Sequence, residues 1–355
     1  MPEKRNRSKS RPPAAKQGEK SARRQPREHT ARGNSAPLAP EAAAPRAARQ
    51  GPRPAERVPV ILETAAEDGY ALIDSGDGVK LERYGPYRIV RPEAQALWPK
   101  SLGDAAWQSA DAVFTGDTEE DGMGRWRFPH AALGETWPMR LLGVDFNGRF
   151  TAFRHVGVFP EQLAHWSWMR DRIAEAKRPV RVLNLFGYTG VASLVAAAVG
   201  AEVTHVDASK KAIGWARENQ AMSGLENRPI RWICDDATKF IQREERRGRT
   251  YDIVLADPPK FGRGPAGEVW QLFEHLPAML DICRSLLSPE AIALVLTAYS
   301  IRASFYSIHE LMRETMRGAG GTVESGELII RETGTDGEGA GRALSTSLFS
   351  RWVAQ

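Results

Sequence analysis

Cysteine is scarce in this chain of 355 residues, which contains two, and long apolar runs are missing. So few thiols exclude a disulfide scaffold and a multi-cysteine zinc site. No stretch approaches the roughly 20 apolar residues that span a bilayer, which excludes a transmembrane helix. The basic opening MPEKRNRSKS is followed by no apolar core and is therefore unlike a secretory signal. A reducing, cytoplasmic location is the plain expectation.

The first 57 residues lack Phe, Trp, Tyr, Ile and Val, and they hold nine of the 23 prolines. Their 15 Lys+Arg and 5 Asp+Glu give a net charge of +10, whereas residues 58–355, with 34 and 39, carry −5. Such a segment buries too little apolar surface to offset its ordering entropy, so we predict a disordered basic tail over 1–57. A mobile basic arm attracts polyanions such as RNA. A solubilising leader, or a start codon placed too early, is an equally open alternative.

Short strand-like runs and tight turns follow, and they predict a small, mainly antiparallel β domain over 58–160. Asp77-Gly78 and Asn147-Gly148 each lie between two such runs, so both pairs are predicted to be hairpin turns. A third hairpin is expected near 122–124. Six of the ten tryptophans lie between residues 98 and 168. Most of these are expected to be packing residues, although aromatic faces can also stack on unpaired bases.

Strand-like and helical runs alternate over residues 161–355, after a helix expected over 159–177. This alternation is typical of a parallel sheet covered on both faces. Five helix-linked strands precede two runs, 322–331 and 345–354, that are joined by a glycine-rich loop. A parallel crossover needs about a dozen residues or more, so the last two strands must be antiparallel. The prediction is an α/β fold with a seven-stranded sheet that ends in an antiparallel hairpin.

Glycines bracket the turn after the first strand of this sheet. Ligands of open parallel sheets bind beyond the carboxyl ends of the strands, where small residues let them approach the backbone. Gly187 and Gly190 are spaced Gly-x-x-Gly, unlike the G-x-G-x-x-G of dinucleotide-binding folds, which counts against an NAD-dependent oxidoreductase. Asp207 ends the second strand 20 residues after Gly187, about the spacing of a ribose-binding acid. Capping the next helix is the alternative role for Asp207.

Carboxylates also end the third and fourth strands. Asp236, with Asp235 as the weaker candidate, is placed to accept from an adenine amine or to cap the following helix. Asp257-Pro258-Pro259 follows a wholly apolar strand and is the sharpest feature. Two prolines remove two backbone donors and fix the turn, so their carbonyls face the crevice. A planar base could stack on Phe261, which follows them.

Together these strand ends resemble the motifs of the class I S-adenosylmethionine-dependent methyltransferases: FGYTG, VDAS, DDAT and DPPKF. More narrowly, the chain is similar to the bacterial large-subunit ribosomal-RNA methyltransferases that have LFxYTG, DPPKF and a small β domain in front. GVFPEQ at 157–162 resembles their GxFxDQ segment, with Glu161 in place of Asp. The resemblance covers about residues 70–355 and implies a Rossmann-like methyltransferase sheet, with S-adenosylmethionine as cofactor and RNA as partner. It implies a cofactor site of Gln162, Asn184, Phe186, Gly187, Tyr188, Thr189, Gly190, Asp207, Ala208, Asp235, Asp236, Ala237 and Asp257, and a catalytic group of Asp257, Pro258, Pro259 and Phe261.

One departure from the family narrows the choice of acceptor atom for the methyl group. Relatives that methylate cytosine C5 use a cysteine after the fifth strand, where this chain has Thr297-Ala298-Tyr299-Ser300. Cys234 and Cys283 are not placed for attack on a base. Direct transfer to a nitrogen or an oxygen remains. The scattered His155, His165 and His275 lack ligand spacing, so no metal site is expected, and His205 is expected to be a core residue.

Three hypotheses stay open from the sequence. The first is an RNA base methyltransferase acting on ribosomal RNA, with the β domain and the tail helping to hold the RNA. Phosphate contacts are then expected from Arg88, Arg91, Arg149 and Arg154, while Lys260 and Arg263 are as easily plain surface residues. The second is a methyltransferase of a small molecule or protein. The third is a non-catalytic RNA-binding or ribosome assembly factor that kept the fold.

Overall fold

The computed structural model describes residues 49–64, 66–116, 123–299, 303–334 and 341–355, and these belong to one compact unit. The predicted disordered tail lies outside the described residues as far as residue 48. No helix in the described ranges is long and apolar enough to cross a membrane.

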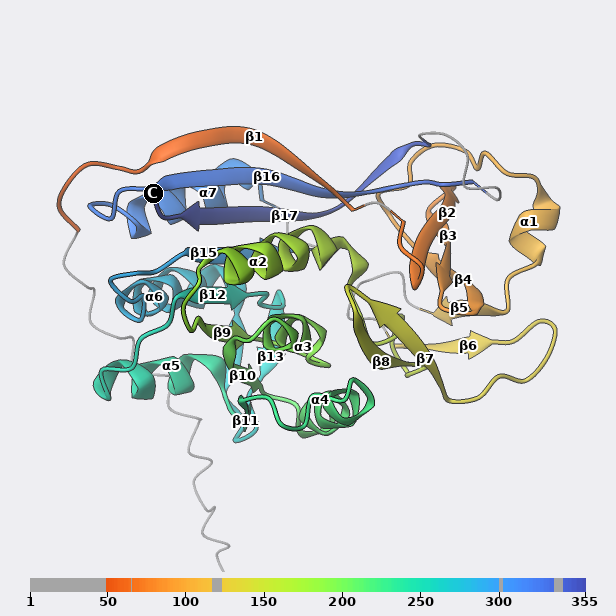
Figure 1. Ribbon diagram of the computed structural model, residues 1–355. Coiled ribbons are helices and arrows are strands. Elements are labelled where there is room, and N and C mark those ends of the chain that lie inside the picture. Colours follow the sequence, from red (N-terminus) through yellow and green to blue (C-terminus); the bar gives the residue numbers. More distant parts are fainter. Residues whose placement is uncertain (1–48, 65, 117–122, 300–302, 335–340) are drawn as a thin grey trace, which may run out of the picture. The chain divides into compact units, whose positions relative to one another are not determined.

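A mixed eight-stranded sheet forms the body of the protein (Figure 1). Five parallel strands are joined through helices: β9 (Arg181–Leu185), β10 (Glu202–Asp207), β11 (Ile230–Cys234), β12 (Ile253–Ala256) and β15 (Ala293–Ala298). The last pair, β16 (Thr322–Arg331) and β17 (Ala343–Val353), is antiparallel, as predicted. The strand order is β1-β16-β17-β15-β12-β9-β10-β11. All seven expected strands are therefore present.

The eighth strand, β1 (Ala55–Thr64), extends the sheet at its edge and pairs in parallel with β16. The residues of β1 were predicted to lie partly in the tail and partly in the front β domain. The alternating exposure along β1 is that of an edge strand, but such a pattern does not reveal which sheet the strand joins. Two ion pairs fix its place: Arg57 with Glu324 at 2.7 Å and Glu63 with Arg331 at 2.6 Å.

Helices cover both faces of the large sheet. One face carries α2 (Leu163–Glu175), α3 (Val191–Ala198) and α4 (Lys210–Met222); the other carries α5 (Ala237–Arg246), α6 (Leu272–Ser285) and α7 (Phe305–Thr315). Because successive side chains of a strand point to opposite faces, Val182 of β9 joins the core under α2 and α3, whereas Leu183 joins the core under α5 and α6. The expected helix after residue 159 is confirmed as a 3-10 turn, Pro160–Gln162, that continues into α2.

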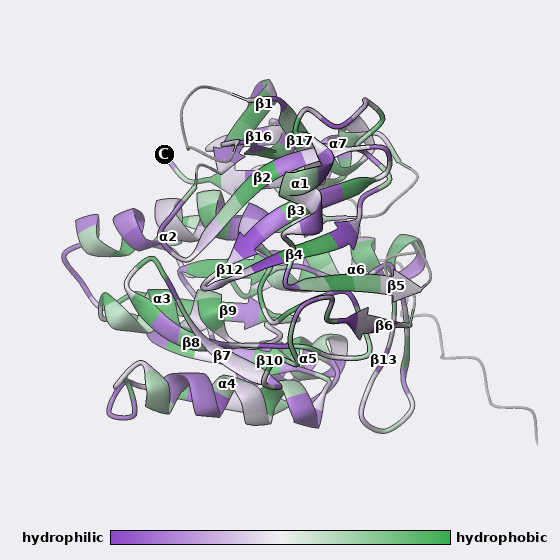
Figure 2. Ribbon diagram, turned by 90° about the vertical axis from the view of Figure 1, so that its right-hand side faces the viewer, coloured by the Kyte–Doolittle hydropathy of each residue, from purple (hydrophilic) through white to green (hydrophobic). Residues whose placement is uncertain are grey.

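A second sheet of five strands stands in front of the body: β2 (Tyr70–Gly76), β3 (Val79–Tyr84), β4 (Tyr87–Pro92), β5 (Ala112–Gly116) and β6 (Gly124–Arg127). Figure 2 looks onto this sheet, with β2 to β5 side by side and the short α1 (Asp104–Gln108) on the side nearer the viewer. Asp77-Gly78 forms the predicted turn between β2 and β3. The third predicted hairpin is the antiparallel pair β5–β6, although its turn lies partly outside the described residues.

The predicted turn at Asn147-Gly148 is wrong. The hairpin of β7 (Thr136–Leu141) and β8 (Val144–Arg149) turns instead at Leu142-Gly143, where φ is 48° and 83°. Gly148 lies within β8 because its partner strand brings Trp137 against it, and a Cβ there would be 2.4 Å from Trp137 Cε2. The glycine therefore serves a close side-chain approach rather than a turn.

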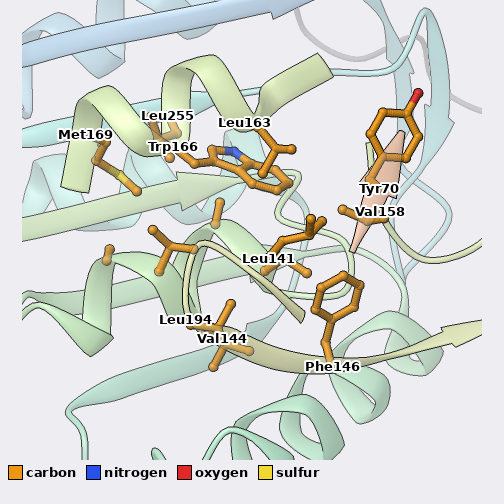
Figure 3. Packing of buried hydrophobic residues seen from close by; sticks show 14 of the residues in the cluster. Tyr70, Leu141, Val144, Phe146, Val158, Leu163, Trp166, Met169, Leu194 and Leu255 are labelled. Atoms are coloured by element: carbon orange, nitrogen blue, oxygen red, sulfur yellow. The ribbon is translucent and has the colours of Figure 1, made fainter. Parts of the chain in front are cut away.

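The β7–β8 hairpin packs onto the large sheet through one shared core. Figure 3 shows Leu141, Val144 and Phe146 of the hairpin beneath Leu163, Trp166 and Met169 of α2. Trp107, Trp137 and Trp166 are buried, while Trp98, Trp126 and Trp168 are partly buried and pack against core clusters. The six tryptophans are thus packing residues, as expected.

Candidate active site

The loop after β9 is held in a strained conformation. Phe186 and Tyr188 have φ values of 57° and 52°, although neither is glycine. A Cβ at Gly187, between them, would lie 2.3 Å from His205 Cε1 and 2.9 Å from Asn184 Nδ2, so only glycine fits. Gly190, at φ 83°, starts α3. Backbone strain of this kind is common at ligand sites, so it supports the prediction that a ligand binds at this turn.

Asp207, at the end of β10, joins this loop to the next one. Its Oδ2 accepts the Tyr188 N–H at 2.9 Å and its Oδ1 accepts the Ser209 N–H at 2.8 Å. Burial raises the pKa of Asp207, and the two backbone hydrogen bonds oppose that rise. Ser209, and not Asp207, caps α4, because the Ser209 Oγ accepts the Ala212 N–H of that helix. A carboxylate has about four acceptor sites, so two are left for a ligand.

The two carboxylates after β11 have different surroundings. Asp236 caps α5 by accepting the Lys239 N–H at 2.9 Å, as its alternative role required, and it also borders the pocket described below. Asp235 is ion-paired with Arg243 and, among the described residues, is not part of the wall of that pocket. The structure thus separates the two acids that the sequence analysis could only rank.

The turn after β12 is fixed by a residue that the sequence analysis did not single out. Trp270 donates its Nε1–H to the Pro259 carbonyl at 2.7 Å, so that carbonyl is already engaged. Trp270 belongs to β14 (Val269–Gln271), which pairs with β13 (Phe261–Arg263) in a small hairpin. The helix that follows this hairpin, α6, begins at Leu272. Pro258 is buried, whereas the Phe261 side chain is 47% exposed beside the site.

Two adjoining chambers lie at this edge of the large sheet. The inner chamber is walled by α2, α3 and the strand ends, and includes Gln162, His165, Asn184, Gly187, Thr189 and Thr297. The outer chamber includes Asp207, Ala208, Asp236, Ala237, Pro259 and Arg263. Phe159, Phe186, Tyr188 and Asp257 border both chambers, so one ligand can extend through them. The four predicted strand ends meet here, as the parallel topology required.

Aromatic rings surround the outer chamber. The Phe159 ring stacks near Tyr299 with centroids 5.8 Å apart and lies 5.6 Å from Tyr188 and 4.8 Å from His155. Phe153, 44% exposed, and Trp270 complete the lining. Phe159 and Tyr188 belong to the GVFPEQ and FGYTG segments, whereas Phe153 and Trp270 lie outside the motifs, so only the fold reveals that these two line the chamber.

The residues fit an adenosyl cofactor. Asp207 keeps acceptor sites for a ribose diol, Asp236 provides one for an adenine amine, and the tight turn at Gly187 keeps the backbone close. The described residues contain one cluster that could hold a metal ion, Glu56, His309 and Glu310. Its carboxylates already pair with Arg313 and Arg53, and the cluster borders neither chamber in the described structure.

Neither cysteine lines a chamber in the described part of the chain. Cys283 is fully buried in α6, and burial raises its thiol pKa to about 12. Cys234 is exposed at the end of β11, with its Sγ 3.7 Å from the Ala208 carbonyl oxygen. His205 is a buried core residue bonded to Ser193 Oγ at 3.0 Å, as expected.

Arg91 is not available to contact the phosphates of a nucleic acid. Its side chain is almost fully buried, pairs with Glu82 at 2.7 Å and donates to the Tyr84 hydroxyl. The predicted phosphate contact of Arg91 is therefore wrong, because its charge is used inside the front sheet. Arg88, Arg149 and Arg154 also donate within the protein, to Ser109, Glu218 and Pro92, but remain partly exposed.

Comparisons with known proteins agree with this geometry. A family model for S-adenosylmethionine-dependent methyltransferases matches residues 103–316. The crystal structure of a SAM-dependent methyltransferase from Agrobacterium tumefaciens is 73% identical, with a TM-score of 0.85, and the match covers 87% of this chain and 98% of that one. SMU.776, described as a methyltransferase complexed with SAH, shares the fold at 17% identity with a TM-score of 0.59, over 81% of this chain and 76% of its own.

Curated relatives are more distant. Ribosomal RNA large subunit methyltransferase K of Neisseria meningitidis serogroup B is 28% identical over 196 residues, which are 52% of this chain and 53% of that protein. Ribosomal RNA large subunit methyltransferase I of Shigella flexneri is 27% identical over 217 residues, 55% and 52% of the two chains. The chain thus spans about half the length of these relatives.

Proposed function

Because this chain belongs to the S-adenosylmethionine-dependent methyltransferase family, we propose that it transfers a methyl group directly to a base of RNA, with ribosomal RNA as the substrate. The two curated relatives named above, which are ribosomal RNA large subunit methyltransferases, support this choice of acceptor. The front β sheet and the basic tail hold the RNA backbone in this proposal.

The aromatic lining of the outer chamber, next to Asp257, is the observation that carries the proposal. Phe153 belongs to this lining and is 44% exposed. Phe261, 47% exposed, is not part of the wall but precedes Gly262 and Arg263, which are, and the Arg263 guanidinium lies 5.9 Å from the Phe261 ring centroid. Unpaired bases stack on such rings, and an arginine at the rim suits the phosphate that follows the base. A base held there would be close to the carboxylate that borders both chambers.

The chain's residues have a limited chemical task. S-adenosylmethionine supplies, when bound, a methyl group on a positively charged sulfur that is already a strong electrophile. The protein must orient the acceptor atom, and Asp257 would do so by accepting a hydrogen bond from the base. Pro258 and Pro259 fix the position of Asp257 through their rigid turn. No thiol is available for a covalent step within the described chambers, which favours direct transfer.

Methyl transfer to RNA tests the proposal. The full chain is mixed with tritiated-methyl S-adenosylmethionine and total RNA from a strain that lacks the gene; RNA from the parent strain, which is already modified, should accept little. Phe153→Ala should lower transfer by about 5- to 150-fold, since Phe153 lines the outer chamber and a stacked base contributes about 1–3 kcal/mol. Phe273→Ala is the matched control, because this ring is also exposed but is not part of the described chamber walls.

Transfer to neither RNA nor assembling ribosomal particles, by a protein that binds the cofactor, would overturn the proposal and point to a small-molecule or protein acceptor. Equal losses in Phe153→Ala and Phe273→Ala would remove the stacking role of Phe153 while leaving the acceptor class intact.

A further inference from the structure

One irregular segment, residues 150–159, connects β8 with the 3-10 turn before α2 and supplies much of the aromatic wall of the outer chamber. Phe153, His155 and Phe159 of this segment all border that chamber. Near its far end, the Gly157 carbonyl accepts a hydroxyl hydrogen from the turn after β9 at 2.6 Å. The segment therefore joins the turn that lies beside the cofactor site to the wall on which the proposed base stacks.

The middle of this segment is held by the front sheet. Arg91, on β4, donates through Nη1 to the Arg154 carbonyl at 3.2 Å, and Arg154 donates in return to the Pro92 carbonyl at 3.1 Å. Trp126, on β6, donates through Nε1 to the Phe153 carbonyl at 3.3 Å. A backbone hydrogen bond of 2.9 Å joins β6 to the residue before Phe153. Strands β4 and β6 thus fix the backbone on both sides of the Phe153 ring.

Arg91 is itself held rigidly inside the front sheet. Its Nε and Nη2 donate to the two carboxylate oxygens of Glu82 at 2.7 and 2.8 Å, and Nη2 also donates to the Tyr84 hydroxyl. Glu82 is fully buried and accepts the Tyr70 hydroxyl hydrogen at 2.9 Å. A two-pronged pair of this kind fixes the orientation of a guanidinium as well as its position. The remaining nitrogen, Nη1, is therefore directed at the segment by bonds that lie within the sheet.

We propose that Arg91 and Trp126 are positioning residues for methyl transfer, because they hold Phe153 and its neighbours where an acceptor base is aligned with the cofactor. Neither residue lines a chamber as described, so each acts through the backbone of the segment. In-line transfer is sensitive to such alignment, since a misplacement of about 1 Å can lower a rate about 100-fold. The front sheet is then part of the acceptor site. This inference rests on the proposed function, which places the base against Phe153.

Two conservative variants remove the bonds to the segment one at a time. Arg91→Lys keeps the buried charge beside Glu82 but has one ammonium group in place of the planar fork, so it cannot reach both the carboxylate and the segment. Trp126→Phe keeps a ring against Phe114 and Phe150 and lacks the indole N–H. In methyl transfer to unmodified RNA by the full chain, kcat should fall about 10- to 100-fold for Arg91→Lys and, with one neutral hydrogen bond lost, about 2- to 10-fold for Trp126→Phe.

Each variant has a matched control in the same part of the protein. Arg83, on β3, also donates to backbone carbonyls, but to those of residues 67 and 68, so Arg83→Lys leaves the segment untouched. Trp98 donates its indole N–H to the Ser75 carbonyl at 3.1 Å, so Trp98→Phe loses a comparable bond elsewhere. Both controls should keep kcat within about twofold of the wild type.

Two further measurements separate positioning from a loss of folded protein. Calorimetry with S-adenosylhomocysteine should give the wild-type stoichiometry for Arg91→Lys and Trp126→Phe, whereas a partly unfolded variant would bind less ligand. Hydrogen exchange followed by mass spectrometry should be faster over residues 150–156 in both variants and unchanged over residues 183–192, around the turn after β9. Neither measurement requires RNA.

Three outcomes would overturn the proposal: an unchanged kcat in both variants, equal losses in the variants and their controls, or a loss of kcat that only matches a loss of S-adenosylhomocysteine stoichiometry. Trp126→Phe and Trp98→Phe decide the question if Arg91→Lys does not fold. A wild-type protein that methylates no RNA would refute the proposed function instead. The exchange experiment would then decide this inference alone, and unchanged exchange over residues 150–156 would overturn it.

Discussion

Replacement of Asp207 should separate its structural bonds from its cofactor bonds. The carboxylate has about four acceptor sites, and the Tyr188 and Ser209 amides occupy two of them. The two others match a ribose diol. Asp207→Asn keeps one acceptor oxygen and should therefore lose one ribose bond, whereas Asp207→Ala should lose both.

The size of each loss follows from this count. A hydrogen bond to a charged group contributes about 1.5–3 kcal/mol, so Asp207→Asn should raise the dissociation constant about 10- to 150-fold. Asp207→Ala, with two such bonds removed, should raise it about 10²- to 10⁴-fold. Asp207→Asn also leaves one loop amide unpaired and Asp207→Ala leaves two, so the folded protein itself should become less stable.

Calorimetry with S-adenosylhomocysteine measures the affinities, and thermal unfolding without ligand measures the structural part. Asp145→Asn is a matched control, because Asp145 of β8 pairs with Arg140 of β7 and is not part of the described chamber walls. Affinity within about threefold of wild type for both Asp207 variants would refute the ribose assignment. A lowered melting temperature with unchanged affinity would show that Asp207 only joins the two loops.

Three other changes have defined outcomes. Gly187→Ala should lower the free energy of unfolding by about 1–3 kcal/mol in denaturant titrations, because its Cβ would collide with the buried His205 ring. Although burial opposes it, the charges of Arg91 and Lys80 lower the Glu82 pKa from 4.5 to about 2. The contribution of the ionised Glu82 to the stability of the fold is therefore complete above about pH 4.5 and is lost as the pH falls toward 2. The stability of Glu82→Gln should fall less steeply with pH than that of the wild type over this range. Equal slopes for the two proteins would contradict this. Removing residues 1–48 should reduce the salt dependence of RNA binding in filter assays, with the S-adenosylhomocysteine affinity unchanged.

The strand ends could be predicted because parallel topology alone brings them together. Once residues 181–298 are seen as alternating strands and helices, Asp207 and Asp257 must lie at one edge of the sheet, whatever the side-chain packing. The same reasoning gave the antiparallel pair β16–β17, because a short connection leaves no other geometry.

Features that depend on register or on distant partners could not be predicted in this way. Arg91 was expected at the surface because its partner, Glu82, lies on a neighbouring strand, and only the β3–β4 register brings the charges together. Trp270 is ordinary in sequence and fixes the turn after β12 only because the fold brings it to the Pro259 carbonyl. Gly148 resembles a turn residue until Trp137 is placed against it.

The position of β1 affects how the protein is made. Arg57 and Glu324 are 267 residues apart in sequence, yet they are ion-paired on adjacent strands. A ribosome releases the amino-terminal strand first, while its partner emerges near the end of translation. β1 therefore has no partner strand during most of synthesis. It can join the edge of the large sheet only after the β16–β17 hairpin has been made. Contacts of such long sequence separation slow folding, so completion of this edge is expected to be a late, post-translational step.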